Sequence, residues 1–250
     1  MSKNIISDAE TDRFTRIIAE VTESAVERSS IGILSEKTLH AVIKAFCDED
    51  RSHHEQRLEG YVADIFDGNR VTEIQTRSFR NLREKLAVFT KKYPVTVVYP
   101  MVMQTTVRKV LKDTGEVLKP RKSPKKGSFH SFLFELYELM DLVSDPNIKF
   151  RVLQVNIEEY RLVKNEKDRG EKGDRIPSAL LGDYSFDLAE DFAELLPEAL
   201  PSCFTAEEYS KAAKVHKGDV YRELKVFVRL GVLKEAEKQG RVKSWTRACN

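Results

Sequence analysis

The chain has 250 residues, a hydrophobic content of 41% and a single tryptophan, which fits an ordinary soluble globular protein of one large or two modest domains. No apolar run approaches the roughly 20 residues of a membrane span, and residues 1–12 lack the apolar core of a signal peptide, so we expect a cytoplasmic protein without membrane contact. The net charge of +2 conceals patches of either sign, and the cysteines (Cys47, Cys203, Cys249) lack the spacing of a disulfide framework or zinc site.

The first elements are predicted from caps and helical spacing. Ser7 and Glu10 form a capping box, and the apolar residues that follow predict an N-terminal helix. Ser35 caps a second helix that runs to about Phe46, with Glu36 in its first turn. Residues 54–58 then indicate a short strand.

Residues 61–76, YVADIFDGNRVTEIQT, predict a tight β-hairpin. A two-residue Gly68-Asn69 loop places Asp64 directly opposite Glu73, whereas an Asp67-Gly68 loop shifts the pairing by two residues. Either register leaves the same residues on one face, because side chains alternate along a strand. These residues are Val62, Asp64, Phe66, Val71, Glu73 and Gln75. Only a three-residue loop would separate Asp64 from Glu73.

Two carboxylates on an otherwise apolar face repel each other and lose hydration unless a cation or donor compensates them. Mg²⁺ (or Mn²⁺) bound by Asp64 and Glu73 is one such compensator. The alternative is an acid pair that is structural or lies on a solvated face, since 33% of the chain is charged.

Downstream, Ser78 caps a helix with Phe79, Leu82 and Leu86 on its apolar stripe, and residues 94–99 (PVTVVY) predict a buried strand. The order helix, three strands, helix, strand over residues 33–100 resembles the core of the PD-(D/E)XK nuclease superfamily, the restriction-endonuclease-like fold. The resemblance implies an α/β (α+β) fold with an αβββαβ core.

The resemblance also implies site residues. Asp64 and Glu73 match the metal-binding acids, and Gln75 takes the position usually held by lysine. Glu36 is similar to the helical glutamate found in several branches, for which Glu55 is a second candidate. The expected chemistry is Mg²⁺-assisted phosphodiester hydrolysis, with Gln75 orienting the attacking water. Glutamine contributes no positive charge, and the basic residues expected to replace it come from the following helix: Arg77, Arg80 or Arg83.

Residues 108–126 carry eight basic residues against two acids, and the two prolines and one glycine of residues 120–128 predict a loop. Its basic residues are expected either to bind phosphate or to be solvated: Arg121, Lys122, Lys125 and Lys126. A helix is predicted from Ser128 to about Val143, and one or two strands over 148–163. The charged residues 165–175 predict a linker, so we expect a nuclease-like domain over 1–175 and a second domain over 183–250.

In the second domain we predict an acidic helix near residues 187–196, a helix capped by Thr205 and Glu208, a helix over 218–230 and a hairpin around Gln239-Gly240. Three helices and a hairpin, with the pattern YRELKVFVRLGVL, resemble the winged-helix family over residues 186–248. The resemblance implies DNA-contacting residues in the groove and the wing. They are Lys217, Asp219 and Arg222 for the groove, and Lys238, Arg241 and Lys243 for the wing.

Together these expectations describe a metal-dependent endonuclease that binds DNA, expected to be double-stranded, and a homodimer if it makes paired cuts. Two alternatives stay open. One is a catalytically silent nuclease-like DNA-binding or regulatory protein, which Gln75 favours. The other is a protein-interaction module in which the acid pair is structural and the basic regions are solvated.

Overall fold

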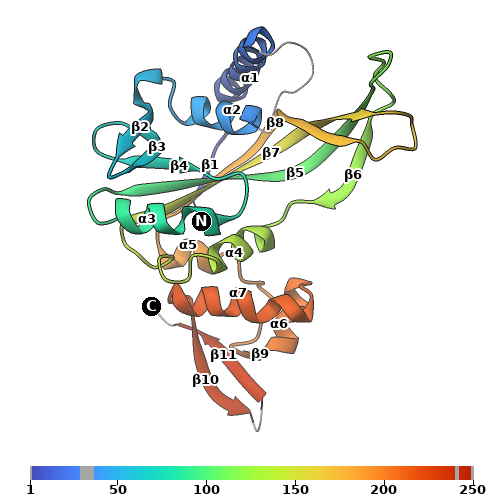
Figure 1. The fold of residues 1–250 in the computed structure, drawn as a ribbon. Helices are drawn as coiled ribbons and strands as arrows, with labels where there is room; N and C mark the ends of the chain where they lie inside the picture. Colours follow the sequence, from blue (N-terminus) through green and yellow to red (C-terminus); the bar gives the residue numbers. More distant parts are fainter. Residues whose placement is uncertain (1, 29–36, 240–241, 249–250) are drawn as a thin grey trace.

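The computed structural model describes residues 2–28, 37–239 and 242–248, which form a mixed α+β structure (Figure 1). In this part of the chain the larger sheet has the order β1-β8-β7-β5-β4-β3-β2, with β6 paired to β5. Its strands are β1 (Ser2–Asn4), β2 (His54–Leu58), β3 (Tyr61–Phe66), β4 (Val71–Ile74), β5 (Val95–Leu111), β6 (Arg121–Lys126), β7 (Ile148–Val163) and β8 (Glu171–Phe186). Its helices are α1 (Asp8–Arg28), α2 (Lys37–Cys47), α3 (Arg83–Phe89) and α4 (Phe129–Tyr137), with short 3₁₀ turns at η1 (Arg51–His53) and η2 (Phe79–Leu82).

Helices cover both faces of the larger sheet (Figure 1). On one face, Leu39 and Val42 of α2 join a buried cluster with Ile74 of β4. On the other, Leu86 and Phe89 of α3 belong to a second cluster that contains Val71, Val97 and the phenylalanines around Phe132. β2, β3 and β4 are antiparallel neighbours, whereas β4 and β5 are parallel because η2 and α3 form the crossover between them. The predicted order of elements over residues 37–99 is therefore present.

The predicted capping box begins α1. The Ser7 hydroxyl accepts from the backbone N–H of Glu10 at 3.2 Å, and the Glu10 carboxylate accepts from the N–H of Ser7 at 2.9 Å. We expect Ser7→Ala to lower the free energy of unfolding by about 1 kcal/mol, because an orphan N–H of the first turn loses its acceptor. Urea denaturation measures this change. Ser7→Asp, which keeps an acceptor, is the control, and an equal loss in both variants would contradict the capping role.

Residues 120–128 do not form the predicted loop, because β6 spans Arg121–Lys126. β6 pairs only with β5, so it is an edge strand, where a proline without an N–H is tolerated. Pro124 lies at an irregularity of the pairing, between the pairs Gln104↔Lys126 and Thr106↔Lys122. The following helix ends at Tyr137, earlier than the predicted Val143.

The predicted linker is also replaced in large part by sheet structure. β8 starts at Glu171 and pairs with β7 as far as Phe186, so the larger sheet crosses the boundary expected between residues 175 and 182. The polar sequence at the start of β8 has a weak local preference for strand structure, and hydrogen bonding to β7 holds it in the sheet. The distal parts of β5 to β8, residues 104–126 and 156–175, project from the body of the molecule and are called the arm (Figure 1).

The C-terminal unit contains α5 (Ala189–Ala193), β9 (Cys203–Thr205), α6 (Ala206–Ala213), α7 (Lys217–Arg229), β10 (Leu233–Gln239) and β11 (Val242–Arg247). Its small sheet has the order β10-β11-β9. The predicted capping box of Thr205 and Glu208 is present, and Gly231 adopts a φ of 75° after α7. α7 lies against α4, and one buried cluster continues from the larger sheet into this unit.

Among the described residues, no helix combines the length and apolar character that a bilayer span requires.

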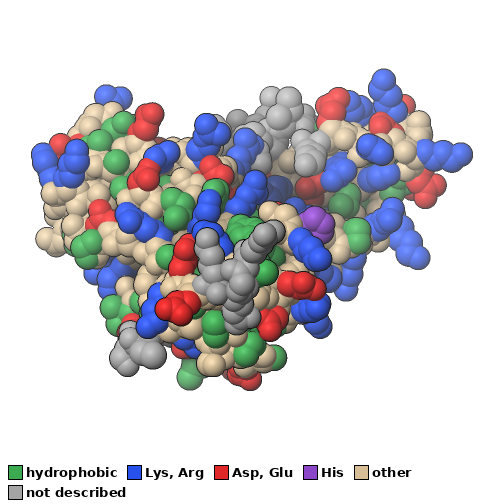
Figure 2. Space-filling view, turned by 90° about the horizontal axis from the view of Figure 1, so that it is seen from below, with side chains coloured by type: hydrophobic (Ala, Val, Ile, Leu, Met, Phe, Trp, Pro, Cys, Tyr) green, Lys and Arg blue, Asp and Glu red, His purple; other side chains and the backbone are tan. Residues whose placement is uncertain are grey.

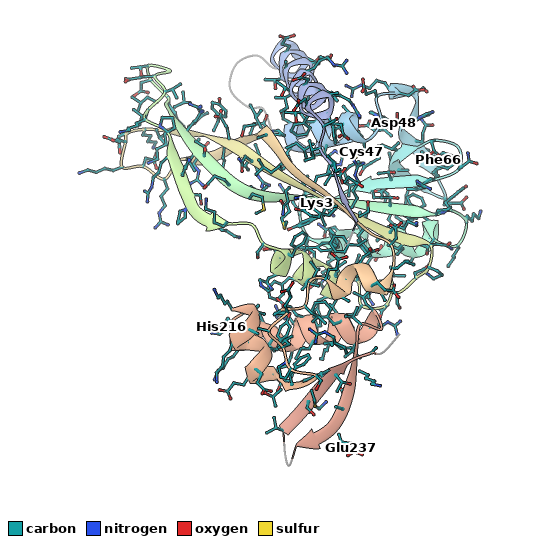
Figure 3. All side chains as sticks on the ribbon, turned by 180° about the vertical axis from the view of Figure 1, so that it is seen from behind. Lys3, Cys47, Asp48, Phe66, His216 and Glu237 are labelled. Atoms are coloured by element: carbon teal, nitrogen blue, oxygen red, sulfur yellow. The ribbon has the colours of Figure 1, made fainter. Side chains whose placement is uncertain are left out.

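Cys47 ends α2 beside Asp48 and the larger sheet (Figure 3). Burial raises the pKa of the Cys47 thiol to about 11, so this cysteine is a protonated, weakly reactive thiol at neutral pH. Cys249 lies outside the described residues.

Candidate functional site

Acidic side chains from β2, β3 and β4 lie in one row across the larger sheet. The pairing of Ile65 with Thr72 and of Phe66 with Val71 makes Asp64 and Glu73 the next opposing pair. This is the register predicted for a two-residue Gly68-Asn69 loop. The pairing of β2 with β3 likewise sets Glu55 opposite Asp64.

The ladder between β3 and β4 stops at the acids, which use their side chains in place of backbone pairing. The Glu73 carboxylate accepts from the N–H of Asp64 at 3.3 Å, and the Asp64 carboxylate accepts from the N–H of Ile74 at 2.8 Å. Each acid therefore bonds to the strand of the other. Charge-assisted bonds to backbone N–H groups hold carboxylates firmly. These bonds therefore fix the point at which β3 and β4 stop pairing with each other.

Glu73 is 1% exposed, and its carboxylate lies 2.5 Å from the ammonium of Lys85 on α3. Burial, and then the charge of Asp64, raise the pKa of Glu73 to about 7, although Lys85 acts in the opposite direction. Glu73 therefore exchanges a proton close to neutral pH. Carboxyl groups that act as acids or bases in active sites commonly have a pKa raised in this way.

Asp64 has a different environment. Its carboxylate lies 3.2 Å from Nε2 of His40 on α2 and accepts from Ile74. Burial alone would raise the pKa of Asp64, but the hydrogen bond and charge of His40 and the Ile74 N–H outweigh it and hold that pKa below its ordinary value. The site thus combines one carboxylate that stays ionised with one that titrates near neutrality.

Lys85 is the residue of the candidate site that sequence reasoning missed. The predicted replacements for the missing lysine were Arg77, Arg80 and Arg83. The residue that forms the ion pair with Glu73 is instead Lys85, two positions after Arg83. Arg83 pairs instead with Asp141. Lys85 lies next to the apolar stripe of Leu82 and Leu86, so helical spacing alone could have marked it as facing the sheet.

Gln75 and Glu55 have partners other than the carboxylates of Asp64 and Glu73. The Gln75 amide donates to the carbonyl of Ser78 at 3.0 Å, so it holds the turn that begins η2. Glu55 pairs with Lys44 at 2.8 Å while 72% of its side chain is exposed. Glu36 lies outside the described residues.

The donors present suit a hard divalent cation, because both acids offer carboxylate oxygens. No described residue donates to Oδ1 of Asp64, whereas both oxygens of Glu73 are engaged, one by the N–H of Asp64 and one by Lys85. Among the described residues no group of three or more acidic, histidine or cysteine side chains has the arrangement of a metal site. A cation held by both acids therefore requires Lys85 to leave Glu73.

The predicted DNA-binding residues of β6 lie on the exposed edge of the arm. In the described structure Arg121, Lys122 and Lys125 form no salt bridge, and the Lys126 ammonium donates to the Gln104 side chain. Figure 2 shows Lys and Arg side chains gathered at the end of the molecule that the arm forms.

Of the C-terminal candidates, Lys217, Arg222 and Lys243 are exposed, and two of them have partners. The Arg222 guanidinium lies 6.0 Å and 5.8 Å from the ring centres of Phe134 and Tyr137 on α4. Lys217 is exposed at the start of α7, beside His216 (Figure 3). Lys243 lies 3.5 Å from Glu235, and Arg241 is outside the described residues.

The comparisons with known proteins place this geometry in a sequence family. The family model described as Domain of unknown function (DUF8091) matches residues 37–187, which include α2, the row of acids and the whole of β8. An uncharacterized protein of Treponema pallidum (strain Nichols) is 28% identical over 224 residues, which cover 86% of each chain. No solved structure matches this chain.

Proposed function

The chain belongs to the DUF8091 family, and we propose that its larger sheet carries a metal-dependent nuclease site formed by Asp64 and Glu73. The observation that carries the proposal is the separation of β3 and β4 at these opposing acids, one ionised and one with a pKa of about 7. The neighbouring strand order β2-β3-β4-β5, with α2 and α3 on opposite faces, supports a restriction-endonuclease-like core.

Asp64 and Glu73 are the residues that would hold Mg²⁺ or Mn²⁺. The bound ion would supply an activated water and neutralise charge on the phosphate during phosphodiester hydrolysis. Glu73 is suited to accept a proton near neutral pH, and His40 keeps the Asp64 side chain in place. Lys85 supplies the positive charge that Gln75 lacks.

Nucleic-acid binding is the second part of the proposal. The basic face of β6 supports attraction of phosphates. The elements β9, α6, α7, β10 and β11, in this order and with the sheet order β10-β11-β9, support a winged-helix assignment for the C-terminal unit. Contact of Arg222 with a DNA groove would compete with its position over the rings of α4.

Cleavage of plasmid and oligonucleotide DNA with Mg²⁺ or Mn²⁺ tests the site. We expect the native protein to cut and Asp64→Ala to lose cutting, because the carboxylate that stays ionised is removed. Glu84→Ala removes an exposed acid of α3 and is the matched control. Cleavage that survives Asp64→Ala would contradict the proposal.

A catalytically silent nucleic-acid-binding protein is the second candidate. The ion pair of Glu73 with Lys85 and the engagement of the Gln75 amide by Ser78 favour it, because both remove groups from metal and water. A gel shift in Ca²⁺ separates the candidates, since binding without cleavage in any divalent ion identifies the silent protein. Salt-insensitive binding would argue against phosphate contacts in both cases.

A further inference from the structure

Two adjoining cavities lie along the arm. The inner cavity, of about 500 Å³, lies between the arm and α4 and reaches Thr76, which follows Gln75 in the chain. The outer cavity, of about 450 Å³, follows β6. They share Val107, Ser123 and Arg161 as lining residues, so they adjoin, and together they are called the track.

The track is strongly basic. The inner cavity is lined by Lys125, Lys126, Arg161 and Arg175 against Glu135 and Glu159. The outer cavity is lined by Lys109, Lys119, Arg121, Lys122, Arg161 and Arg169 against Glu166. The basic residues outnumber the acidic ones in both cavities and are spread along the track. The track therefore suits an extended anion better than a single small ion.

Arg175 is the residue that indicates a ligand in the inner cavity. Its side chain is half-buried, burial lowers the pKa of its guanidinium, and it forms no salt bridge in the described structure. Glu159 lies directly across the strand pair from Arg175 but is held by Arg161 at 2.5 Å. A guanidinium placed in this way has donors left for a phosphate, which it binds in bidentate geometry.

The dimensions of the two cavities suit the nucleotides of a single strand. Both volumes lie at the low end of the roughly 300–1,000 Å³ range of small-molecule sites, so each admits a group of nucleotide size. A duplex keeps its phosphates on the outside of a much wider cylinder. Tyr99 and Phe134 add aromatic surface to the inner cavity, and sites for single strands combine a basic groove with aromatic rings in the same way.

We propose that this track binds a single strand of nucleic acid through its phosphates, with Arg175 holding one phosphate in the inner cavity. The inference rests on the proposed function for the class of polymer and changes the expected substrate from a plain duplex to one with a single-stranded segment. The inner cavity reaches Thr76, three residues after Glu73 in the chain.

Fluorescence anisotropy in EDTA, with a labelled single-stranded oligonucleotide and the same sequence as a duplex, measures this binding without cleavage. We expect the single strand to bind at least about tenfold more tightly, and Arg175→Gln to weaken single-strand binding about tenfold, which corresponds to one charged contact. If Arg175→Gln fails to fold, Lys125→Gln provides the same test, because it changes an exposed residue of the same cavity. Lys91→Gln, an exposed lysine outside the track, is the matched control.

Oligonucleotides with and without a 5′-phosphate distinguish the source of the bound group. Tighter binding of the phosphorylated strand identifies a terminal phosphate, and equal binding identifies an internal one. Equal affinity for duplex and single strand, or affinity unchanged in both Arg175→Gln and Lys125→Gln, would overturn the inference. Because this binding needs neither Asp64 nor metal, its failure is distinguishable from failure of the nuclease site.

Discussion

In the native protein, the free energy of unfolding is expected to fall by about 3 kcal/mol as the pH rises and Glu73 ionises, and Glu73→Gln is expected to abolish this fall. The folded pKa of Glu73, about 7, lies above its ordinary value of 4.5, so the native state holds a proton that the unfolded state has released between these values. The free energy of unfolding therefore falls as pH rises through this window and levels off above about pH 7. The amide of glutamine does not titrate, so the variant lacks this fall.

Urea denaturation of both proteins between pH 4 and pH 8 measures the effect as a difference. Glu59→Gln, which removes a carboxylate paired with exposed Lys92 at 2.8 Å, is the matched control and should follow the native curve. Native and Glu73→Gln curves that stay parallel would show that Glu73 ionises at its ordinary pKa. If the metal proposal holds, Mg²⁺ raises the free energy of unfolding near and above pH 7 and so reduces the fall that precedes it, because the cation favours the ionised carboxylates.

The hairpin shows how far local chemistry predicts this site. Gly68 and Asn69 tolerate the backbone of a two-residue turn, and that turn sets the register opposing Asp64 to Glu73. The helices were predictable from caps at Ser7, Ser78 and Thr205, whose side chains accept from backbone N–H groups within three residues. In each case the determining contacts are local in the chain.

Contacts between distant segments decided the remaining features. The carboxylate partners His40 and Lys85 come from helices on opposite faces of the sheet, so their convergence depends on packing. β6 and β8 resemble loops by composition and became strands because β5 and β7 provide pairing partners. The packing of α4 on α7, which brings two aromatic rings to Arg222, likewise cannot be predicted from periodicity.

His130→Ala is expected to loosen the C-terminal unit from α4 and to lower the free energy of unfolding by about 2 kcal/mol. Glu223 of α7 is 0% exposed and is held by the Tyr209 hydroxyl at 2.6 Å and by Nδ1 of His130 at 3.0 Å. Removal of His130 leaves a buried carboxylate with one donor fewer. The His130 side chain is 35% exposed, so solvent screening keeps the loss below that of a fully buried pair.

The contribution of His130 depends on pH. The hydrogen bond to Glu223, opposed by partial burial, raises the pKa of His130 above its ordinary value of 6.5. The stabilisation is therefore fully present below pH 6.5 and lost as pH rises through the folded pKa. Urea denaturation at pH 6 and pH 8.5 should show a larger difference between native protein and His130→Ala at pH 6. Tyr209→Phe removes the other donor, and its loss should be the same at both pH values.

The same interface affects how α7 can meet DNA. Arg222 is exposed but lies over Phe134 and Tyr137, and Glu223, the next residue, is bound to His130, so contact of Arg222 with a groove competes with its position on α4. If the winged-helix proposal holds, His130→Ala should bind duplex DNA more tightly than the native protein at pH 6, and Arg222→Gln should cancel this gain. The difference between native protein and His130→Ala should shrink at pH 8.5, where the native His130 is losing its charge. A gain that survives Arg222→Gln would instead assign the added affinity to a surface other than α7.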